Sequence, residues 1–298
     1  MEYLNDFING YTGYANFMWQ EITFSYDYKP WYQNYFYWLI LVSLFFFGLE
    51  VAKPWRKEQP KFRKDFWLDV FYMFFNFFLF SLVIYNAASN VVVNFFNDGI
   101  IALTGFDLQS SNPMNNFPYW SILLIGFIVR DFTQWWTHRL LHRVPKLWEF
   151  HKVHHSVKEM GFAAHLRYHW METVVYRTIE YLPLALLGIG LYDFFIIHIF
   201  TLAWGHFNHS NIKVGLGPLK YIFNNPQMHI WHHAKYIPES RQYGVNFGIT
   251  LSVWDYIFGT DYIPHDGRDI ELGFSDVDEF PEDFVGQMTH GLPISHKH

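Results

Sequence analysis

The sequence predicts an all-α integral membrane protein with about four membrane-entering helices, arranged as two hairpins, and a cytoplasmic helical cap. Three features indicate this fold class. Charged residues make up only 16% of the chain and aromatic residues 22%, whereas an average soluble domain is about one-quarter charged. Two long stretches carry no charge at all. The mean hydropathy near zero then fits a hydrophobic half joined to a polar half that holds the 17 histidines.

The first hairpin is predicted from two uncharged stretches. Pro30–Leu49 runs for 20 positions without a charge and Val70–Asn97 for 28, and about 20 apolar residues suffice to cross the hydrocarbon core. Between them, Lys53–Lys64 holds six basic residues against one acid. Because cytoplasmic loops are enriched in Lys and Arg, we expect this loop to face the cytoplasm.

The second hairpin is expected further along the chain. A third crossing begins near Pro118 and returns to the cytoplasm as a helix that runs through Arg130–Trp136. Two apolar stretches, Ile179–Leu191 and Phe194–Phe207, are separated by glycines, and we expect them to enter and leave the membrane. The remaining basic residues lie beside the histidines, which places every histidine group on the cytoplasmic face.

The chain divides into three predicted regions, which are 1–116 with the first hairpin, 117–262 with the histidines, and 263–298 as an acidic soluble tail. The sequence contains no cysteine, which excludes disulfides, thiolate metal sites and iron–sulfur clusters. A net charge of -6 gives no indication of nucleic-acid binding. Residues 1–28 lack the basic start and apolar core of a secretory signal, so none is expected.

Three histidine boxes have helical spacing. They are His138 with His142, then His151 with His154 and His155, then His229 with His232 and His233. Residues at i and i+4 lie on one helix face about one turn apart, so both imidazoles can reach the same ion. Four more histidines lie between the boxes, at His165, His169, His206 and His209, and five lie outside any box, at His198, His265, His290, His296 and His298.

The number of imidazoles predicts two metal ions, because one ion takes only four to six ligands. Imidazole without thiolate suits Fe, Zn, Cu or Mn. A zinc hydrolase typically carries a glutamate inside its box, yet Arg139 follows His138 and no box holds a carboxylate. Iron with O2 fits better, since the many Phe and Trp residues can enclose a C–H-rich substrate. A histidine-rich zinc-dependent membrane hydrolase or zinc-storage protein is the alternative.

The boxes and their flanking residues carry a resemblance. The opening block contains Asp131, Trp136-Thr137-His138, His142 and Pro145-x-x-Trp148-x-x-His151-x-x-His154-His155-Ser156. The closing block contains Asn224-x-Pro226-x-x-His229-x-x-His232-His233, Tyr243-Gly244-Val245-Asn246 and Trp254-Asp255-x-x-Phe258-Gly259-Thr260. Across Phe117–Tyr262 this resembles the fatty acid hydroxylase/sterol desaturase superfamily, above all its bacterial and alkylglycerol-monooxygenase-like branch.

This resemblance implies a di-iron oxidoreductase with O2 as co-substrate. It implies hydroxylation or desaturation of a lipid-like substrate, whether fatty acyl, sterol, alkylglycerol or carotenoid. It also implies a separate electron donor of ferredoxin or cytochrome type with its reductase, and a multi-pass protein of the bacterial inner membrane whose active site faces the cytoplasm. Zinc can replace iron in purified protein because Zn2+ binds nitrogen sites more tightly than Fe2+.

The expected metal ligands are His138, His142, His151, His154, His155, His169, His209, His229, His232 and His233. His169 resembles a family His-Pro-x-Glu element, with Trp170 in place of proline, and His209 matches a lone histidine before the last box. His165 and His206 remain open as alternative or supporting ligands. From helix spacing, Asp131 is expected to accept an imidazole N–H and Glu172 to hold the ring of His169. The alternative for Asp131 is an ion pair or solvation of the helix end at the membrane edge, and the alternative for Glu172 is an ordinary surface acid.

Overall fold

The structure is a computed structural model that describes residues 2–107, 110 and 113–293. This part of the chain is helical, and its only β-type pairings are two isolated bridges, Phe223 with Leu251 and Ala234 with Leu272. The all-α expectation is therefore confirmed.

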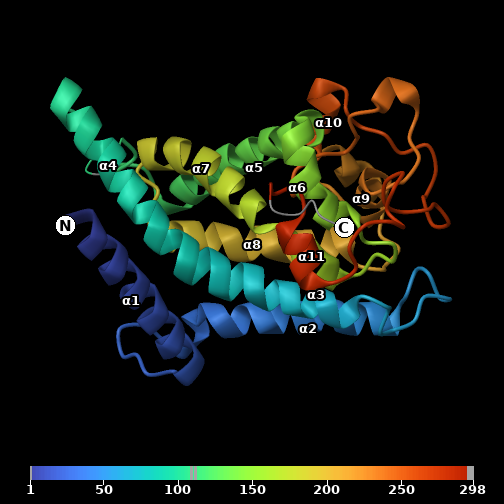
Figure 1. The fold of residues 1–298 in the computed structure, drawn as a ribbon, viewed down its shortest axis with the longest axis horizontal. Helices are drawn as coiled ribbons and strands as arrows, with labels where there is room; N and C mark the ends of the chain where they lie inside the picture. The colour runs from blue at the N-terminus through green and yellow to red at the C-terminus, as the bar shows by residue number, and fades with distance from the viewer. Residues whose placement is uncertain (1, 108–109, 111–112, 294–298) are drawn as a thin grey trace.

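The N-terminal part is built from consecutive helical elements. They are α1 (Glu2–Thr23), the 3-10 turn η1 (Trp31–Gln33), α2 (Tyr35–Ala52), α3 (Phe66–Tyr72), the π-helical segment η2 (Met73–Tyr85) and α4 (Asn86–Thr104). The side chain of Asn34 starts α2 by accepting a hydrogen bond from the Tyr37 amide at 2.9 Å. α3, η2 and α4 follow one another without a break and form one long helical run, which packs against α1 at its far end (Figure 1).

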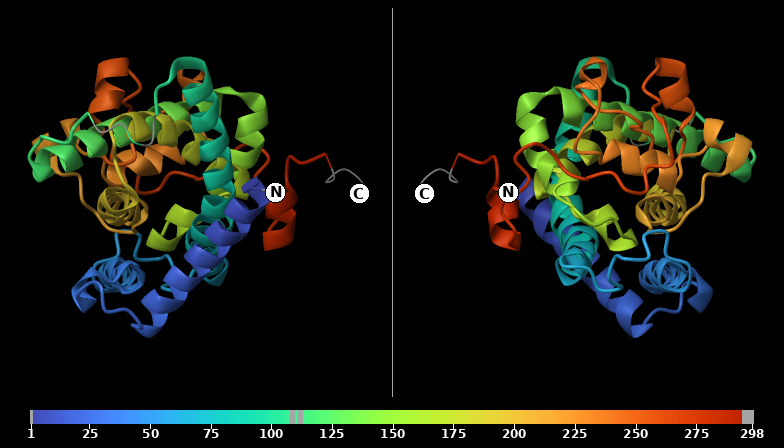
Figure 2. Two further views of the ribbon diagram at one scale, coloured as in Figure 1. Left: turned by 90° about the vertical axis from the view of Figure 1, so that its left-hand side faces the viewer. Right: turned by 90° about the vertical axis from the view of Figure 1, so that its right-hand side faces the viewer.

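The second half contains α5 (Tyr119–Arg143), α6 (Pro145–His155), η3 (Phe162–Leu166), α7 (Trp170–Leu186) and α8 (Leu191–His209). Shorter elements complete the cap, namely η4 (Gly217–Tyr221), α9 (Pro226–His232), η5 (Glu239–Arg241), α10 (Val253–Phe258) and α11 (Phe284–Thr289). α5 contacts both α7 and α8, and α8 lies beside α2, as the end-on views of Figure 2 also show. The cap covers one end of these long helices (Figure 1).

The apolar stretches Ile179–Leu191 and Phe194–Phe207 lie largely in two consecutive helices, each longer than its stretch, and whether they enter a membrane stays a prediction. α7 begins at Trp170, well before the apolar stretch, and ends at Leu186. Gly188 then adopts a φ of 72°, a conformation that favours glycine, and α8 starts at Leu191. The glycines therefore form the turn, as the sequence predicts.

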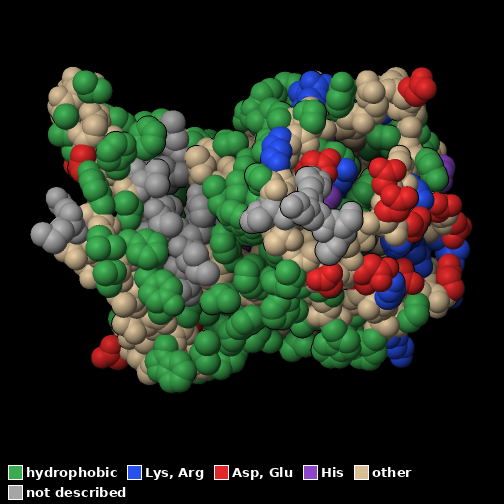
Figure 3. All heavy atoms as spheres, in the orientation of Figure 1, with side chains coloured by type: hydrophobic (Ala, Val, Ile, Leu, Met, Phe, Trp, Pro, Cys, Tyr) green, Lys and Arg blue, Asp and Glu red, His purple; other side chains and the backbone are tan. Residues whose placement is uncertain are grey.

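Membrane insertion is supported by one helix. Among the described residues, α2 alone is long and apolar enough to cross a membrane, and Phe66–Phe80 form a shorter apolar helix. The multi-pass arrangement is therefore not confirmed by the structure. On the face shown in Figure 3, hydrophobic side chains dominate over α2 and the neighbouring helices, whereas acidic and basic side chains gather over the cap. On this face, the charged side chains therefore lie mainly over the cap, and hydrophobic side chains cover much of the rest.

The cap has its own apolar core, which joins distant segments. Trp55 of the basic loop packs with Val157, Ile230, Trp231 and Leu272. Residues after 262 belong to this packing as well, because Phe280 and Met288 are buried against Val153 of α6. Up to residue 293, the predicted acidic tail therefore packs closely on the histidine-rich region, although the three-region division itself stays a prediction.

Candidate metal centre

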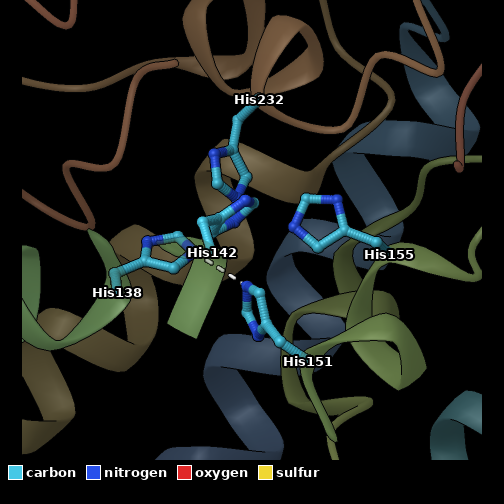
Figure 4. A group of neighbouring side chains, drawn as sticks. All are labelled: His138, His142, His151, His155 and His232. Atoms are coloured by element: carbon cyan, nitrogen blue, oxygen red, sulfur yellow. Dashed lines mark hydrogen bonds between the residues drawn. The ribbon is translucent and has the colours of Figure 1, made fainter. Parts of the chain in front are cut away.

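Nine histidines converge beneath the cap in two groups. The first histidine group comprises His138, His142, His151, His155 and His232, and the second histidine group comprises His154, His209, His229 and His233. Within each group, one nitrogen of every ring lies within 4.8 Å of the others. Figure 4 shows the rings of the first histidine group pointing toward a common centre. Of the ten expected ligands, nine are thus brought together, and His169 is the one that lies elsewhere.

Helical spacing decides how the boxes divide. The i, i+4 pairs His138–His142, His151–His155 and His229–His233 each stay within one group. The third member of each longer box, His154 or His232, turns to the other group because it lies on a different part of the helix surface. Each three-histidine box therefore serves both groups and ties them into one centre.

Two short helices, α6 and α9, hold two of the boxes in place. α6 begins directly after α5, with Pro145 at its first position, where the missing N–H costs nothing. α9 is only seven residues long and is capped by Asn225, whose side chain accepts from the amides of Gln227 and Met228. These caps fix the direction in which each short helix points its imidazoles.

Backbone carbonyls determine which ring nitrogens carry a proton. The Nδ1 of His154 lies 3.1 Å from the Arg167 carbonyl, and the Nδ1 of His209 lies 2.8 Å from the Gly205 carbonyl. A carbonyl oxygen only accepts, so each Nδ1 must donate its proton. The Nε2 atoms of a neutral His154 and a neutral His209 then carry lone pairs, and they face each other at 3.3 Å. Two lone pairs at this distance repel unless a cation lies between them.

Other pairs of Nε2 atoms lie at similarly short distances. Nε2 of His229 lies 3.0 Å from Nε2 of His209 and 3.2 Å from that of His233, and Nε2 of His138 lies 3.1 Å from that of His151. Two nitrogens that share one ion at about 2.1 Å lie about 3.0 Å apart at right angles and about 3.4 Å apart in a tetrahedron. Further buried ring nitrogens without a hydrogen-bond partner are Nε2 of His142, His155 and His232. The donor set therefore fits two metal ions, one in each histidine group.

Burial keeps these imidazoles neutral. Removal from water lowers the pKa of His154 to about 3 and places the pKa values of His155 and His232 well below their usual range. A neutral imidazole keeps the lone pair that a metal ion requires, so the site is ready to bind metal at neutral pH.

The geometry agrees with the comparison to known proteins. Residues 123–260 match the fatty acid hydroxylase family. This region of the chain is therefore similar to the fatty acid hydroxylase family. The matched region contains both histidine groups entirely, so the family resemblance and the metal centre concern the same part of the fold.

Relatives in this family are similar over part of their length. The ornithine lipid hydroxylase OlsE of Rhizobium tropici is 31% identical over 175 residues, which is 59% of this chain and 51% of that protein. The alkylglycerol monooxygenase of Homo sapiens is 33% identical over 139 residues, 45% of this chain and 29% of that protein. Methylsterol monooxygenase 1-1 of Arabidopsis thaliana is 28% identical over 144 residues, 47% of each. The chain thus spans about half the length, or less, of these relatives. No solved structure gives a significant match.

The closing family motif supports the histidines through the backbone. Nδ1 of His138 donates to the Phe247 carbonyl and Nδ1 of His232 to the Val245 carbonyl, each at 2.8 Å. Asp255 fixes this loop, since its carboxylate accepts hydrogen bonds from the amides of Phe247 and Gly248 at 2.9 and 2.8 Å. The Trp-Asp motif therefore orients imidazoles from a distance.

Asp131 has a role similar to that of Asp255 and differs from the sequence expectation. Its carboxylate accepts from the amides of Thr250 and Leu251 and, at 2.9 Å, from the indole N–H of Trp254. These partners occupy both oxygens, and none of its described hydrogen bonds comes from an imidazole. Asp131 thus anchors the segment that follows the orienting loop.

Glu172 orients a different histidine from the one expected. Its Oε2 lies 2.8 Å from Nδ1 of His151, in the first histidine group, while Oε1 accepts from the His169 amide. The ring of His169 lies outside both groups, where it accepts from the Met171 amide and stacks on Phe150. The structure therefore uses His169 to start α7, and this helix presents Glu172 to the metal centre.

The remaining histidines occupy varied positions. His165 and His206 lie outside both groups, with their Nδ1 atoms 3.3 Å apart, and Nε2 of His206 contacts Ser43 at 3.1 Å. His265 is exposed, His290 pairs with Glu149 at 2.9 Å, and His296 and His298 lie outside the described residues. His198, which the box pattern sets aside, lines a cavity beside the metal centre and contacts Arg130 at 3.1 Å. Isolated histidines carry no spacing signal that could have revealed this position.

Proposed function

We propose that this chain is a membrane-bound di-iron monooxygenase that hydroxylates a C–H bond of a lipid. The observation that carries the proposal is that both histidine groups open onto one cavity. That cavity occupies about 870 Å³, its open part included, and is lined by His138 and His151 of the first group and His154, His209 and His229 of the second. A substrate in this space would lie against both metal positions.

The nine grouped histidines would hold two iron ions, which when bound supply the activation of O2. The balanced reaction is R–H + O2 + 2 e⁻ + 2 H⁺ → R–OH + H2O. The chain itself binds and orients the substrate, because Leu166, Leu202 and Ile249 line the same cavity and offer apolar contacts to a hydrocarbon chain. A hydrocarbon chain that fills the space beside these residues would displace water from the reacting carbon.

The relatives support hydroxylation over hydrolysis. The names of the relatives from Rhizobium tropici, Homo sapiens and Arabidopsis thaliana describe a lipid hydroxylase or a monooxygenase. No carboxylate belongs to either histidine group among the described residues. Glu172, which lines the cavity, already accepts hydrogen bonds from His151 and His169. We therefore keep the zinc-dependent hydrolase or zinc-storage protein only as an outcome of the test below.

We further propose a multi-pass protein whose metal centre faces the cytoplasm. Trp55 and Arg56 of the Lys53–Lys64 loop pack on the cap, where the Trp55 amide donates to Asn211 and the Arg56 guanidinium to the Arg268 carbonyl. The positive-inside rule puts this loop in the cytoplasm, and the cap goes with it. A cytoplasmic ferredoxin- or cytochrome-type donor would supply the two electrons, because this chain has no cysteine for an iron–sulfur cluster.

A lipid comparison tests the proposal. Cells that express the wild-type chain, and cells that express His154→Ala, are extracted and analysed by mass spectrometry with and without O2. We expect a lipid heavier by 16 mass units only with the wild type and O2. A loss of 2 mass units would indicate desaturation instead, and O2-independent cleavage products would support the hydrolase. No difference between wild type and variant in any lipid would refute an oxidative function.

A further inference from the structure

The cavity extends from the metal centre along three helices, and polar side chains occupy its far end. α5, α7 and α8 form its walls, and each contributes residues at i, i+4 and i+8 that line it. At the metal end these residues are His138, Glu172 and His209; in the middle they are Gln134, Tyr176 and Gly205; at the far end they are Arg130, Glu180 and Thr201. Eight residues of helix rise about 12 Å, which separates the far end from the metal centre.

The far end contains a buried arginine, a partly exposed arginine and a buried glutamate. Arg130 is 2% exposed and donates to the Thr201 hydroxyl at 2.6 Å. Its Nε lies 3.7 Å from Oε2 of Glu180, and Nη1 of Arg177 lies 3.6 Å from the same oxygen. We call Arg130, Arg177 and Glu180 the charged end of the cavity. Its formal charge is +1, because two guanidinium groups face one carboxylate.

These charges are incompletely satisfied by the protein. Both Glu180 oxygens and the Arg130 Nε are buried and have no hydrogen-bond partner among the described residues, and the carboxamide oxygen of the neighbouring Gln134 has none either. The two ion pairs are too long for hydrogen bonds. Buried ions normally need close pairing and complete hydrogen bonding, and ionisable groups at membrane depth mark functional sites. A purely structural triad would be expected to close up.

We propose that the charged end of the cavity binds an anionic group of the substrate, a carboxylate or a phosphate ester, and so sets which carbon reaches the metal centre. An anion there would neutralise the excess positive charge and accept the unused N–H of Arg130. Glu180 would limit the net charge to +1 and accept from a donor on the ligand. The substrate class is then an amphiphile whose anionic group lies about 12 Å from the carbon that reacts. This inference rests on the proposed lipid oxidation at the same centre.

The test is equilibrium binding without a reductant, so that no turnover is needed. Full-length protein in nanodiscs of neutral lipid is titrated with oleate, oleoyl-lysophosphatidate and oleyl alcohol, which share one acyl chain and differ in the head. We expect wild type to bind at least one of the two anions ten-fold or more tighter than the alcohol. If oleate binds more tightly, the anionic group of the substrate is a carboxylate. If oleoyl-lysophosphatidate binds more tightly, it is a phosphate ester.

One variant that removes a positive charge and one that removes a negative charge separate anion binding from a structural role. Arg177→Gln should bring the ratio of anion affinity to alcohol affinity close to one. Glu180→Gln should raise this ratio, because it removes the carboxylate that faces both guanidinium groups. Arg143→Gln is the matched control on α5, since Arg143 is exposed, stacks on Tyr243 and does not line the cavity. It should leave the ratio unchanged.

Two results would overturn the inference. One is equal wild-type affinity for all three probes, and the other is a Glu180→Gln variant that weakens anion binding as Arg177→Gln does. Should Arg177→Gln fail to fold, the wild-type ratio and the Glu180→Gln variant still decide. Failure of the proposed function would look different, because it would abolish O2-dependent product while leaving the charge preference in binding intact.

Discussion

Glu172→Gln should weaken metal binding at the first histidine group by about ten- to hundred-fold. Glu172 and His151 are both buried and meet at 2.8 Å, and the second oxygen of Glu172 accepts from the His169 amide. Glutamine has a single acceptor oxygen, so its NH2 group must face one of these two donors. Loss of a partner that orients a ligating histidine typically costs this factor, which corresponds to about 1.4–2.7 kcal/mol.

The assay is competition for metal with a chelator of known affinity, followed by the metal content of the protein. We expect Glu172→Gln to lose the first ion at a lower chelator concentration than wild type and to retain the second ion. Glu149→Gln is the control, because Glu149 lies on α6 beside the box but pairs with Lys152 and His290 at the surface. Equal chelator resistance of Glu172→Gln and wild type would refute the role assigned to Glu172.

Three further variants probe the surroundings of the metal centre. Asp255→Asn should lower the free energy of unfolding by about 2–4 kcal/mol, measured by chemical denaturation. The two carboxylate oxygens of Asp255 accept from the amides of Phe247 and Gly248, and asparagine has only one oxygen to accept with. Gly205→Ala should weaken oleate binding, because a Cβ there would lie 2.1 Å from the His165 ring and the two groups would have to shift within the cavity that both residues line. The metal content should stay unchanged. Gly48→Ala is the control, because a Cβ at Gly48 meets open space, and this variant should bind oleate as wild type does. His169→Ala should keep both metals and cost about 1 kcal/mol of stability through the lost cap of α7, and loss of a metal ion would return His169 to the ligands.

Much of the metal centre could be predicted because its signal is local. The i, i+4 spacing of each box identifies the face of one helix, and the structure keeps each such pair within one histidine group. The division of the longer boxes between two groups also follows from this geometry, since His154 and His232 lie on another part of their helices. The glycine turn between α7 and α8 is equally local.

Contacts between distant segments could not be predicted in the same way. Spacing along α7 assigns Glu172 to His169, yet the packing of α6 on α7 brings His151 within reach instead. Asp131 lies two turns before His138, but its carboxylate meets amides some 120 positions later in the chain. A single sequence carries no record of such partners, and the same holds for the charged end of the cavity, which forms only when α5 and α7 pack together.

The central claim, two metal ions held by two histidine groups, is tested most directly by counting ions. Protein purified without oxygen and reloaded with Fe(II) is analysed for iron per chain, for wild type, His232→Ala and His154→Ala. We predict two ions for wild type and about one for each variant, because His232 belongs to the first histidine group and His154 to the second. A single ion in wild type, or two ions retained in both variants, would contradict the account.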